Sequence, residues 1–285
     1  MSSYPFVKGH GTENDFVLLP DHDGSLHGKL EAGRVAALCD RHAGIGGDGV
    51  MRVIRTEALA EIDPETRELG AGTEWFMDYR NSDGSLSEMC GNGVRVFGRH
   101  LAEEGLIDPS GPVPVGTRAG VKVLTFAGDG ITVDMGVPTI GSPTQVEVVE
   151  RGWQATNVDM GNPHAVAFVD SLDDAGTLLQ EPVHDREAYP HGVNVEFVVQ
   201  RGERHVAMRV HERGSGETRS CGTGACAVMV AAALLDGACD TDGPAEDLTY
   251  RVDVPGGTLR VTWTAAGRML LAGPAVLVAQ GVTDL

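Results

Sequence analysis

The chain has 285 residues, of which 41% are hydrophobic, and its formal net charge is -19 at pH 7. This length and hydrophobic content allow one large domain or two ordinary ones, each with a core. The negative charge excludes partners that attract basic surfaces, so we expect no nucleic acid and no anionic membrane surface.

The five cysteines are too few, and odd in number, for a disulfide framework, and no C-x-x-C pair is present. We therefore expect reduced thiols and no metal site. No apolar run approaches the roughly 20 residues of a membrane-spanning helix. The opening Met1 to Pro5 lacks the charged and apolar regions of a signal peptide, which favours a cytoplasmic protein.

Two short strands are predicted near the start, at 6–8 and 15–19, on either side of a polar turn that presents Asn14. A helix is predicted over 30–41, with Cys39 on its apolar face and hence in the core. The next loop contains G-x-G-x-x-G at 44–49, but it follows a helix and opens a strand. A dinucleotide site needs the reverse order, so nucleotide binding is not indicated.

A strand over 73–80 leads to a turn at 81–85, then to Cys90 and a helix over 94–104. Alone, Asn81 is best interpreted as a turn former. A hairpin with strands at 121–126 and 131–135, turning at Asp129, follows prolines that end this part of the chain. A domain boundary is expected near Gly128.

The second half repeats this order of strands, polar turn, Cys-Gly-x-Gly and helix. Strands are expected near 146–149, 154–160, 165–169, 193–200, 206–210, 250–254, 259–263, 269–271 and 275–279. Helices are expected over 171–179 and from the Cys221 motif to Leu235. The repetition predicts two similar α+β domains, 1–127 with 274–285 and 128–273.

The two repeated motifs are Cys90-Gly91-Asn92-Gly93 and Cys221-Gly222-Thr223-Gly224. Each precedes an apolar helical run, so each thiol should lie at a helix start whose first amides have no intrahelical partner. Such amides can hold a carboxylate and favour a thiolate. The pair suggests two acid/base groups acting on one small acid; the alternative is two buried cysteines ahead of unrelated Gly-rich turns.

Together with further motifs, these residues resemble the diaminopimelate epimerase family nearly end to end. The shared stretches are Gly11 to Phe16, Asp40-Arg41-His42 through Asp48, Asn81-Ser82-Asp83-Gly84, Cys90-Gly91-Asn92-Gly93, Met160-Gly161-Asn162-Pro163-His164, Gly192-Val193-Asn194, and Glu212-Arg213-Gly214 through Ala225.

The resemblance implies two pseudo-symmetric α/β domains with the active site in the cleft between them, and a homodimer. It implies Cys90 and Cys221 as proton-transfer residues, supported by His164 and Glu212 respectively. The substrate α-carboxylate would lie on the amides of Gly91, Asn92, Gly222 and Thr223, and the rest of a diaminopimelate would contact Asn14, Asn81, Asn162, Asn194, Glu212 and Arg213.

No cofactor is expected. Lys8, Lys29 and Lys122 are the only lysines, and none lies in a motif that would hold pyridoxal phosphate. Two thiols suit cofactor-free inversion because one can serve as base while the other remains a protonated acid.

Two positions depart from the family pattern. Gly49 stands where some members have a substrate-contacting Gln, and Ala279 stands where some have a dimer-contacting Tyr.

Other functions remain open from the residues alone. A proline or hydroxyproline racemase of the same architecture would also have two cysteines, a thiol hydrolase would need only one, and a non-catalytic amino-acid-binding protein would need neither. His164 alone could cap a strand, and Glu212-Arg213 could be a solvated pair.

Overall fold

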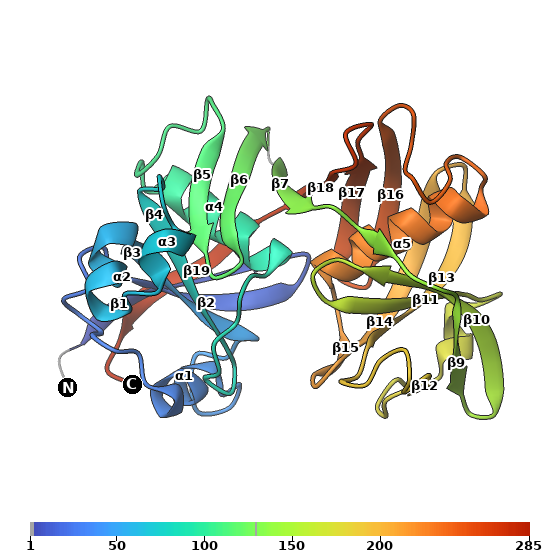
Figure 1. Ribbon diagram of the computed structural model, residues 1–285. Coiled ribbons are helices and arrows are strands. Elements are labelled where there is room, and N and C mark those ends of the chain that lie inside the picture. The colour runs from blue at the N-terminus through green and yellow to red at the C-terminus, as the bar shows by residue number, and fades with distance from the viewer. Residues whose placement is uncertain (1–2, 129) are drawn as a thin grey trace. The chain divides into compact units, whose positions relative to one another are not determined.

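The chain forms two compact units in the computed structural model, which describes residues 3–128 and 130–285 (Figure 1). One unit comprises Met1–Val133 and Pro274–Leu285, and the other comprises Asp134–Gly273. Strand β7 (Gly130–Gly136) begins in the first unit because its Val133 pairs with Leu124. The first crossing between the units therefore lies after Val133, some residues beyond the boundary expected near Gly128. The turn expected at Asp129 lies outside the described residues.

The first unit is a mixed sheet in the order β19-β1-β2-β3-β4-β5-β6-β7. The pairs β2/β3 and β4/β5 are parallel and the others antiparallel. Its strands are β1 (Tyr4–Gly11), β2 (Asn14–Pro20), β3 (Gly49–Arg55), β4 (Trp75–Asn81), β5 (Val113–Thr117), β6 (Gly120–Ala127), β7 and β19 (Val276–Thr283).

The second unit has the same succession of pairings in the order β9-β10-β11-β13-β14-β16-β17-β18, with β11/β13 and β14/β16 parallel. Its strands are β9 (Thr144–Val148), β10 (Arg151–Asp159), β11 (Pro163–Phe168), β13 (Asn194–Gly202), β14 (His205–Glu212), β16 (Leu248–Val254), β17 (Gly257–Trp263) and β18 (Met269–Pro274), with short β8 (Thr139–Ile140), β12 (Val183–His184) and β15 (Gly216–Thr218). The predicted pair of similar α/β domains is confirmed.

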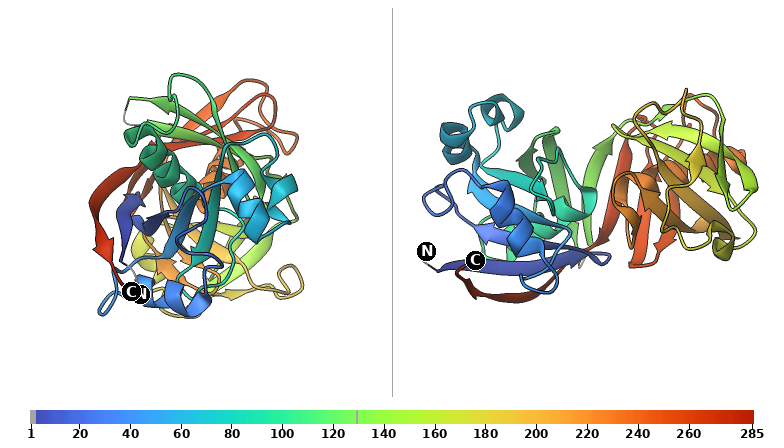
Figure 2. Two further views of the ribbon diagram at one scale, coloured as in Figure 1. Left: turned by 90° about the vertical axis from the view of Figure 1, so that its left-hand side faces the viewer. Right: turned by 90° about the horizontal axis from the view of Figure 1, so that it is seen from below.

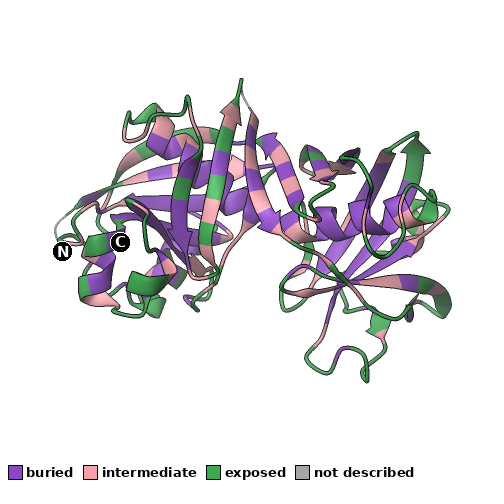
Figure 3. Ribbon diagram, turned by 45° about the horizontal axis from the view of Figure 1, so that its top comes forward, coloured by how far each residue is buried: buried purple, intermediate pink, exposed green. Residues whose placement is uncertain are grey.

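Each sheet encloses one buried helix. Helix α4 (Gly91–Glu103) packs on β1, β2, β3 and β19, and α5 (Gly222–Leu235) packs on β10, β11, β13, β14, β16 and β17. Both helices are largely buried along their length (Figure 3). Nearly every side of α5 is apolar, as expected for a helix surrounded by other elements.

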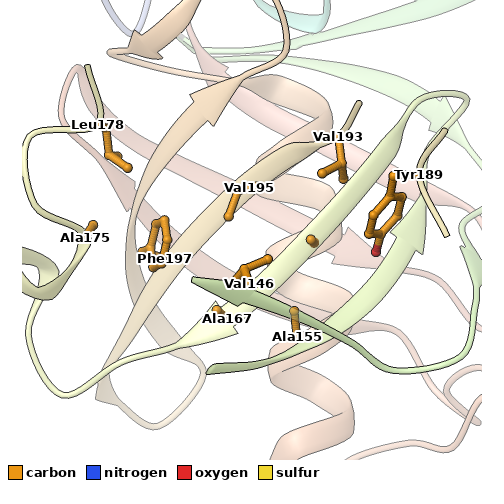
Figure 4. Close-up of a cluster of buried hydrophobic side chains, with 10 residues drawn as sticks. Val146, Ala155, Ala167, Ala175, Leu178, Tyr189, Val193, Val195 and Phe197 are labelled. Atoms are coloured by element: carbon orange, nitrogen blue, oxygen red, sulfur yellow. The ribbon is translucent and has the colours of Figure 1, made fainter. Parts of the chain in front are cut away.

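Apolar side chains from neighbouring strands fill each core. In the second unit Val146, Val195 and Phe197 pack together, with Tyr189 and Leu178 closing the cluster from loops (Figure 4). In the first unit Val17, Leu19 and Val50 pack against α1 (Ala32–Cys39), and Cys39 belongs to this core, as predicted.

Strands β1 and β19, the first and last of the chain, lie side by side (Figure 2). They do so because β1 and β19 pair antiparallel, with Tyr4 opposite Thr283. Within residues 3–128 and 130–285, no helix combines the length and apolar character needed to cross a membrane.

Several short elements differ from the sequence predictions. The helix expected over 171–179 is only a 3-10 turn, η1 (Leu172–Ala175), because Gly176 follows at φ 63° and leaves the helical region. Helices α2 (Thr56–Ile62) and α3 (Thr66–Leu69) and strand β5 were not predicted. Pro114 is tolerated in β5 because the β4 ladder contacts only Val115 and Gly116.

The buried His27 provides a stability prediction. Burial lowers its pKa from the ordinary 6.5 to about 4, and its ring packs edge-on against Tyr4. The unfolded chain binds the proton more readily than the folded one, so protonation of His27 favours unfolding. The resulting loss in the free energy of unfolding is absent above pH 6.5 and grows as the pH falls towards 4.

Urea unfolding near neutral pH and at about pH 4.5 should show His27→Leu losing less stability on acidification than the parent, by about 2 kcal/mol. A variant at the exposed His42, such as His42→Gln, is the matched control and should follow the parent. Equal acid sensitivity of His27→Leu and parent would contradict the prediction.

Candidate active site

Both motif cysteines cap the starts of buried helices. Cys90 precedes α4 and its Sγ accepts the Gly93 N–H at 3.4 Å; Cys221 precedes α5 and accepts the Gly224 N–H at 3.3 Å. The prediction that each thiol lies just before a helix is confirmed, although α4 begins at Gly91 rather than at Val94. A thiol therefore receives one of the N–H groups that a helix start leaves without an intrahelical partner.

The strand pairings relate the other candidate residues of the two units. Asn14 is the first residue of β2, and Asn162 immediately precedes the equivalent β11. Asn81 ends β4, whereas Glu212 ends the equivalent β14. Asn194 begins β13, and its counterpart at the start of β3 is Gly49. The candidate residues thus occupy repeated strand ends next to the capped helices.

The first unit holds Cys90, Gly91, Asn92, Asn14 and Asn81. Asn14 Oδ1 lies 3.5 Å from Cys90 Sγ and 3.1 Å from Asn92 Nδ2, so these residues are brought together. Asn81 instead donates to Ser85 Oγ at 3.0 Å, which supports its role as a turn former.

A tight hairpin presents Asn14. Thr12 and Glu13 join β1 to β2 with φ of 51° and 63°, the left-handed conformation that a two-residue turn between twisted strands requires. Non-glycine residues adopt it at a cost, and such strain is common near functional sites.

An ionic cluster lies beside Asn14. Asp48 Oδ1 and Asp15 Oδ1 each accept from Arg41 at 2.7 Å, and Lys8 also pairs with Asp15. Burial acts to raise the pKa of Asp15, but the hydrogen bonds and charges of Arg41 and Lys8 outweigh it and hold that pKa well below its usual range. Asp15 is therefore a carboxylate at every ordinary pH.

In the second unit a chain of hydrogen bonds leads to Cys221. His164 Nδ1 lies 2.6 Å from Glu196 Oε1, and His164 Nε2 lies 3.1 Å from Asn162 Oδ1. Asn162 Nδ2 donates to Thr223 Oγ1 at 3.3 Å, and that hydroxyl is 3.5 Å from Cys221 Sγ. His164, predicted to support Cys90, has these contacts within its own unit.

The expectation that the helix start would favour a Cys221 thiolate is wrong. Burial raises the pKa of Cys221 well above its usual range, and the charges of Glu212 and Glu196 add to the effect. The Thr223 hydroxyl and the Gly224 N–H act in the opposite direction but are outweighed. Desolvation of a fully buried ion exceeds what a helix terminus contributes.

Glu212, Asn194 and Arg213 lie at adjoining strand ends. Asn194 Oδ1 accepts the backbone N–H of Arg213 at 2.9 Å, and the Thr218 hydroxyl donates to Glu212. The Arg213 side chain is exposed and borders a cavity of about 650 Å³ that His211 also lines. Such a side chain is placed to meet a carboxylate from solvent.

Glu196 was not among the site residues predicted from the sequence. It is fully buried, and a Cβ added at position 224 would lie 2.7 Å from its Oε1, so a larger residue there would displace the Glu196 carboxylate. A charged residue within the apolar strand Val195 to Val199 was the available signal. Burial raises the pKa of Glu196, and the His164 ring at 2.6 Å acts in the opposite direction.

The backbone at Gly49 leaves no room for a larger side chain. A Cβ at this position would lie 2.5 Å from the Arg80 carbonyl oxygen and 2.6 Å from the Tyr79 ring. In the part of the chain that is described, no three His, Cys, Asp or Glu residues gather as a metal site would require.

Solved structures with the same architecture define the class. A Bacillus anthracis protein of the PhzF phenazine biosynthesis family matches with a TM-score of 0.72 and 16% identity over 100% of both chains. A hydroxyproline epimerase from Agrobacterium vitis, solved with bound trans-4-hydroxy-L-proline, matches with a TM-score of 0.65 and 14% identity over 99% of this chain and 91% of that one. The chain has the two-domain α/β fold of these proteins.

Sequence comparison identifies the family within that fold. The family model for diaminopimelate epimerase matches residues 6–141 and 156–278. Diaminopimelate epimerase of Streptomyces coelicolor is 57% identical over 98% of this chain and 95% of its own length. The enzyme of Thermobifida fusca is 48% identical over 97% of this chain and 96% of its own. This chain belongs to the diaminopimelate epimerase family.

The environment of Cys221 yields a prediction about thiol reactivity. Because the Glu212 charge contributes to the raised pKa of Cys221, Glu212→Gln should increase the thiolate fraction. Alkylation of Cys221 at about pH 8, followed by peptide mass spectrometry, should become several-fold faster. Glu217→Gln, which neutralises a carboxylate paired with Arg209 instead, should leave the rate unchanged. A slower or equal rate in Glu212→Gln would contradict the electrostatic assignment.

Proposed function

We propose that this member of the diaminopimelate epimerase family interconverts LL-2,6-diaminopimelate and meso-2,6-diaminopimelate without a cofactor, in the synthesis of lysine and peptidoglycan precursors. The observation that carries this proposal is the pair of cysteine-capped helices, one in each unit, in a chain whose relatives at 57% and 48% identity are diaminopimelate epimerases.

The chemistry requires two protein groups at one carbon. A thiolate takes the α-proton: the C–H bond breaks, an S–H bond forms, and the electron pair is delocalised towards the carboxylate. The second thiol then delivers its own proton to the opposite face, so a new C–H bond forms and that sulfur becomes the thiolate. The two thiols exchange protonation states with each turnover.

Amides at the helix starts supply the stabilisation. The N–H groups of Gly91 and Asn92, and of Gly222 and Thr223, follow the capping thiols directly, and N–H groups there attract a carboxylate whose charge increases as the proton leaves. Each helix start thus serves both the thiol and the carboxylate.

The remaining candidate residues would hold the substrate and assist the thiols. Arg213, exposed beside its cavity, would bind the distal carboxylate, with Asn14, Asn81, Asn162 and Asn194 contacting the amino-acid centres. Glu212 would take the proton from Cys221, whose pKa is raised by burial, and His164 would assist Cys90.

Hydrogen exchange tests the two-thiol mechanism. LL-diaminopimelate incubated in deuterated water should yield meso product carrying solvent deuterium at the inverted carbon from the first turnovers, because the proton delivered is not the proton removed. Cys90→Ala and Cys221→Ala should each reduce epimerisation by at least about a thousandfold, since neither direction proceeds without both groups.

Cys39→Ala, at a core cysteine of the first unit, is the control for substitution of a thiol. A motif variant that still epimerises near the parent rate, or product that retains the original proton, would overturn the mechanism. Trans-4-hydroxy-L-proline as alternative substrate separates the diaminopimelate reaction from that of the hydroxyproline epimerase with the same fold.

We propose further that the protein is a cytoplasmic homodimer. Its five cysteines are free thiols, as a reducing compartment maintains them. Strand β19 exposes Val276, Val278 and Val282, with 44%, 55% and 67% of their surfaces accessible, and a second copy of the chain would bury such a row.

Sedimentation should therefore show a dimer for the parent and a monomer for Val278→Asp, because a carboxylate in a buried apolar interface is strongly disfavoured. Val149→Asp, at an exposed valine of the other unit, is the matched control and should remain dimeric. A dimer that persists in Val278→Asp would exclude this strand from the interface.

A further inference from the structure

The equivalent asparagines of the two units present opposite ends of their amides to the capped helices. Asn14 directs its carbonyl oxygen at Asn92 and Cys90, whereas Asn162 directs its NH2 group at Thr223. Since the backbones repeat, the difference must come from the side chains that hold each asparagine.

The orientation of Asn14 follows from groups that can bond in only one way. Its Nδ2 donates at 2.7 Å to Asp48 Oδ2, a carboxylate oxygen that can only accept. On the side of Asn14 that faces α4, the fully buried Arg95, which can only donate, donates a hydrogen bond to Asn92 Oδ1 at 2.8 Å. Asn92 Nδ2 is left to donate to Asn14, so the atom of Asn14 facing both Asn92 and Cys90 is the oxygen.

A carbonyl oxygen 3.5 Å from Cys90 Sγ accepts a hydrogen bond from the protonated thiol and repels the thiolate. The second unit has the reverse polarity. Thr223 receives the Asn162 NH2 group, so its own hydrogen is free to point at Cys221, 3.5 Å away. Asp48 has no equivalent there, because the residue before β13 is Val193.

We propose that Asp48 is a positioning residue which, by holding the Asn14 amide, keeps the Cys90 thiol protonated. This inference rests on the proposed function for its meaning: Cys90 would be the acid that delivers the first proton. Asp48 acts through Asn14 and does not touch the reacting atoms.

Charged and polar neighbours hold the Asp48 carboxylate in place beside Asn14. Asp48 is held by Arg41 and by the backbone N–H of Asp15 at 3.1 Å, and Asp15 in turn binds Arg41 and Lys8. Arg41 is thus shared by two carboxylates. The carboxylate that orients Asn14 is anchored on two sides.

A double-mutant cycle tests the proposal with the intact protein and iodoacetamide, without substrate. The rate of Cys90 alkylation at about pH 7 is followed by peptide mass spectrometry in the parent, Asp48→Ala, Asn14→Ala and the double variant. Removing the Asn14 oxygen should accelerate alkylation about tenfold, and Asp48→Ala about threefold, because loss of one hydrogen bond to the thiol form changes the balance by about that factor.

The double variant shows whether Asp48 acts on Cys90 by positioning Asn14 or by its negative charge alone. If Asp48 acts through Asn14, its removal in the Asn14→Ala background changes the rate by less than twofold; if its charge acts directly on Cys90, the two effects multiply. Asp48→Glu, which keeps an acceptor-only carboxylate, should restore the parent rate. Multiplicative effects, or an Asn14→Ala rate within twofold of the parent, overturn the proposal.

Two controls accompany the cycle. Asp23→Ala removes an exposed carboxylate of the same unit that binds Ser25 and should leave Cys90 unchanged. Cys221, mapped in the same digest, should keep its rate in all variants. If Asp48→Ala does not fold, the Cys90 alkylation rates of Asn14→Ala and Asp48→Glu test the proposal. Because no substrate is used, a failed epimerisation assay leaves this result intact, and a failed cycle leaves the two-thiol mechanism intact.

Discussion

The N–H groups at the starts of α4 and α5 are the constraint on which the structure depends. A helix start leaves several donors without partners, and these two starts lie within buried segments, where unpaired donors are costly. In each unit one of the donors is given to a cysteine thiol. The Gly-x-Gly that follows lets neighbouring strands approach closely, as Glu196 does beside Gly224. In both units, therefore, the cysteine side chain satisfies a backbone group that the helix start would otherwise leave buried and unpaired.

The backbone repeats but the side chains do not. Both sheets have the same succession of parallel and antiparallel pairs, so equivalent positions fall at equivalent strand ends. At those equivalent positions the first unit has Gly49 where the second has Asn194, and Asn81 where the second has Glu212. A repeated backbone frame thus carries different side-chain hydrogen bonding in the two units.

Burial rather than the helix terminus dominates the electrostatics of the second unit. A helix start contributes at most about 2 kcal/mol in favour of an anion. Desolvation of a fully buried thiolate costs more than that, and for Cys221 the nearby carboxylates increase the cost. The charges of Glu212 and Glu196 act in the same direction as burial, so the protonated form of the Cys221 thiol is favoured.

The sequence alone determined the repeated architecture, the capping position of both thiols, the core location of Cys39 and the family. It could do so because turn residues, helix starts and apolar periodicity are local properties of the chain. Tertiary structure alone decided what those residues touch. It buried Glu196 against His164, brought Asp48 and Asn92 to opposite ends of the Asn14 amide, and raised the pKa of Cys221. These outcomes depend on which distant segments pack together and on how much water that packing excludes. Local sequence patterns determine neither.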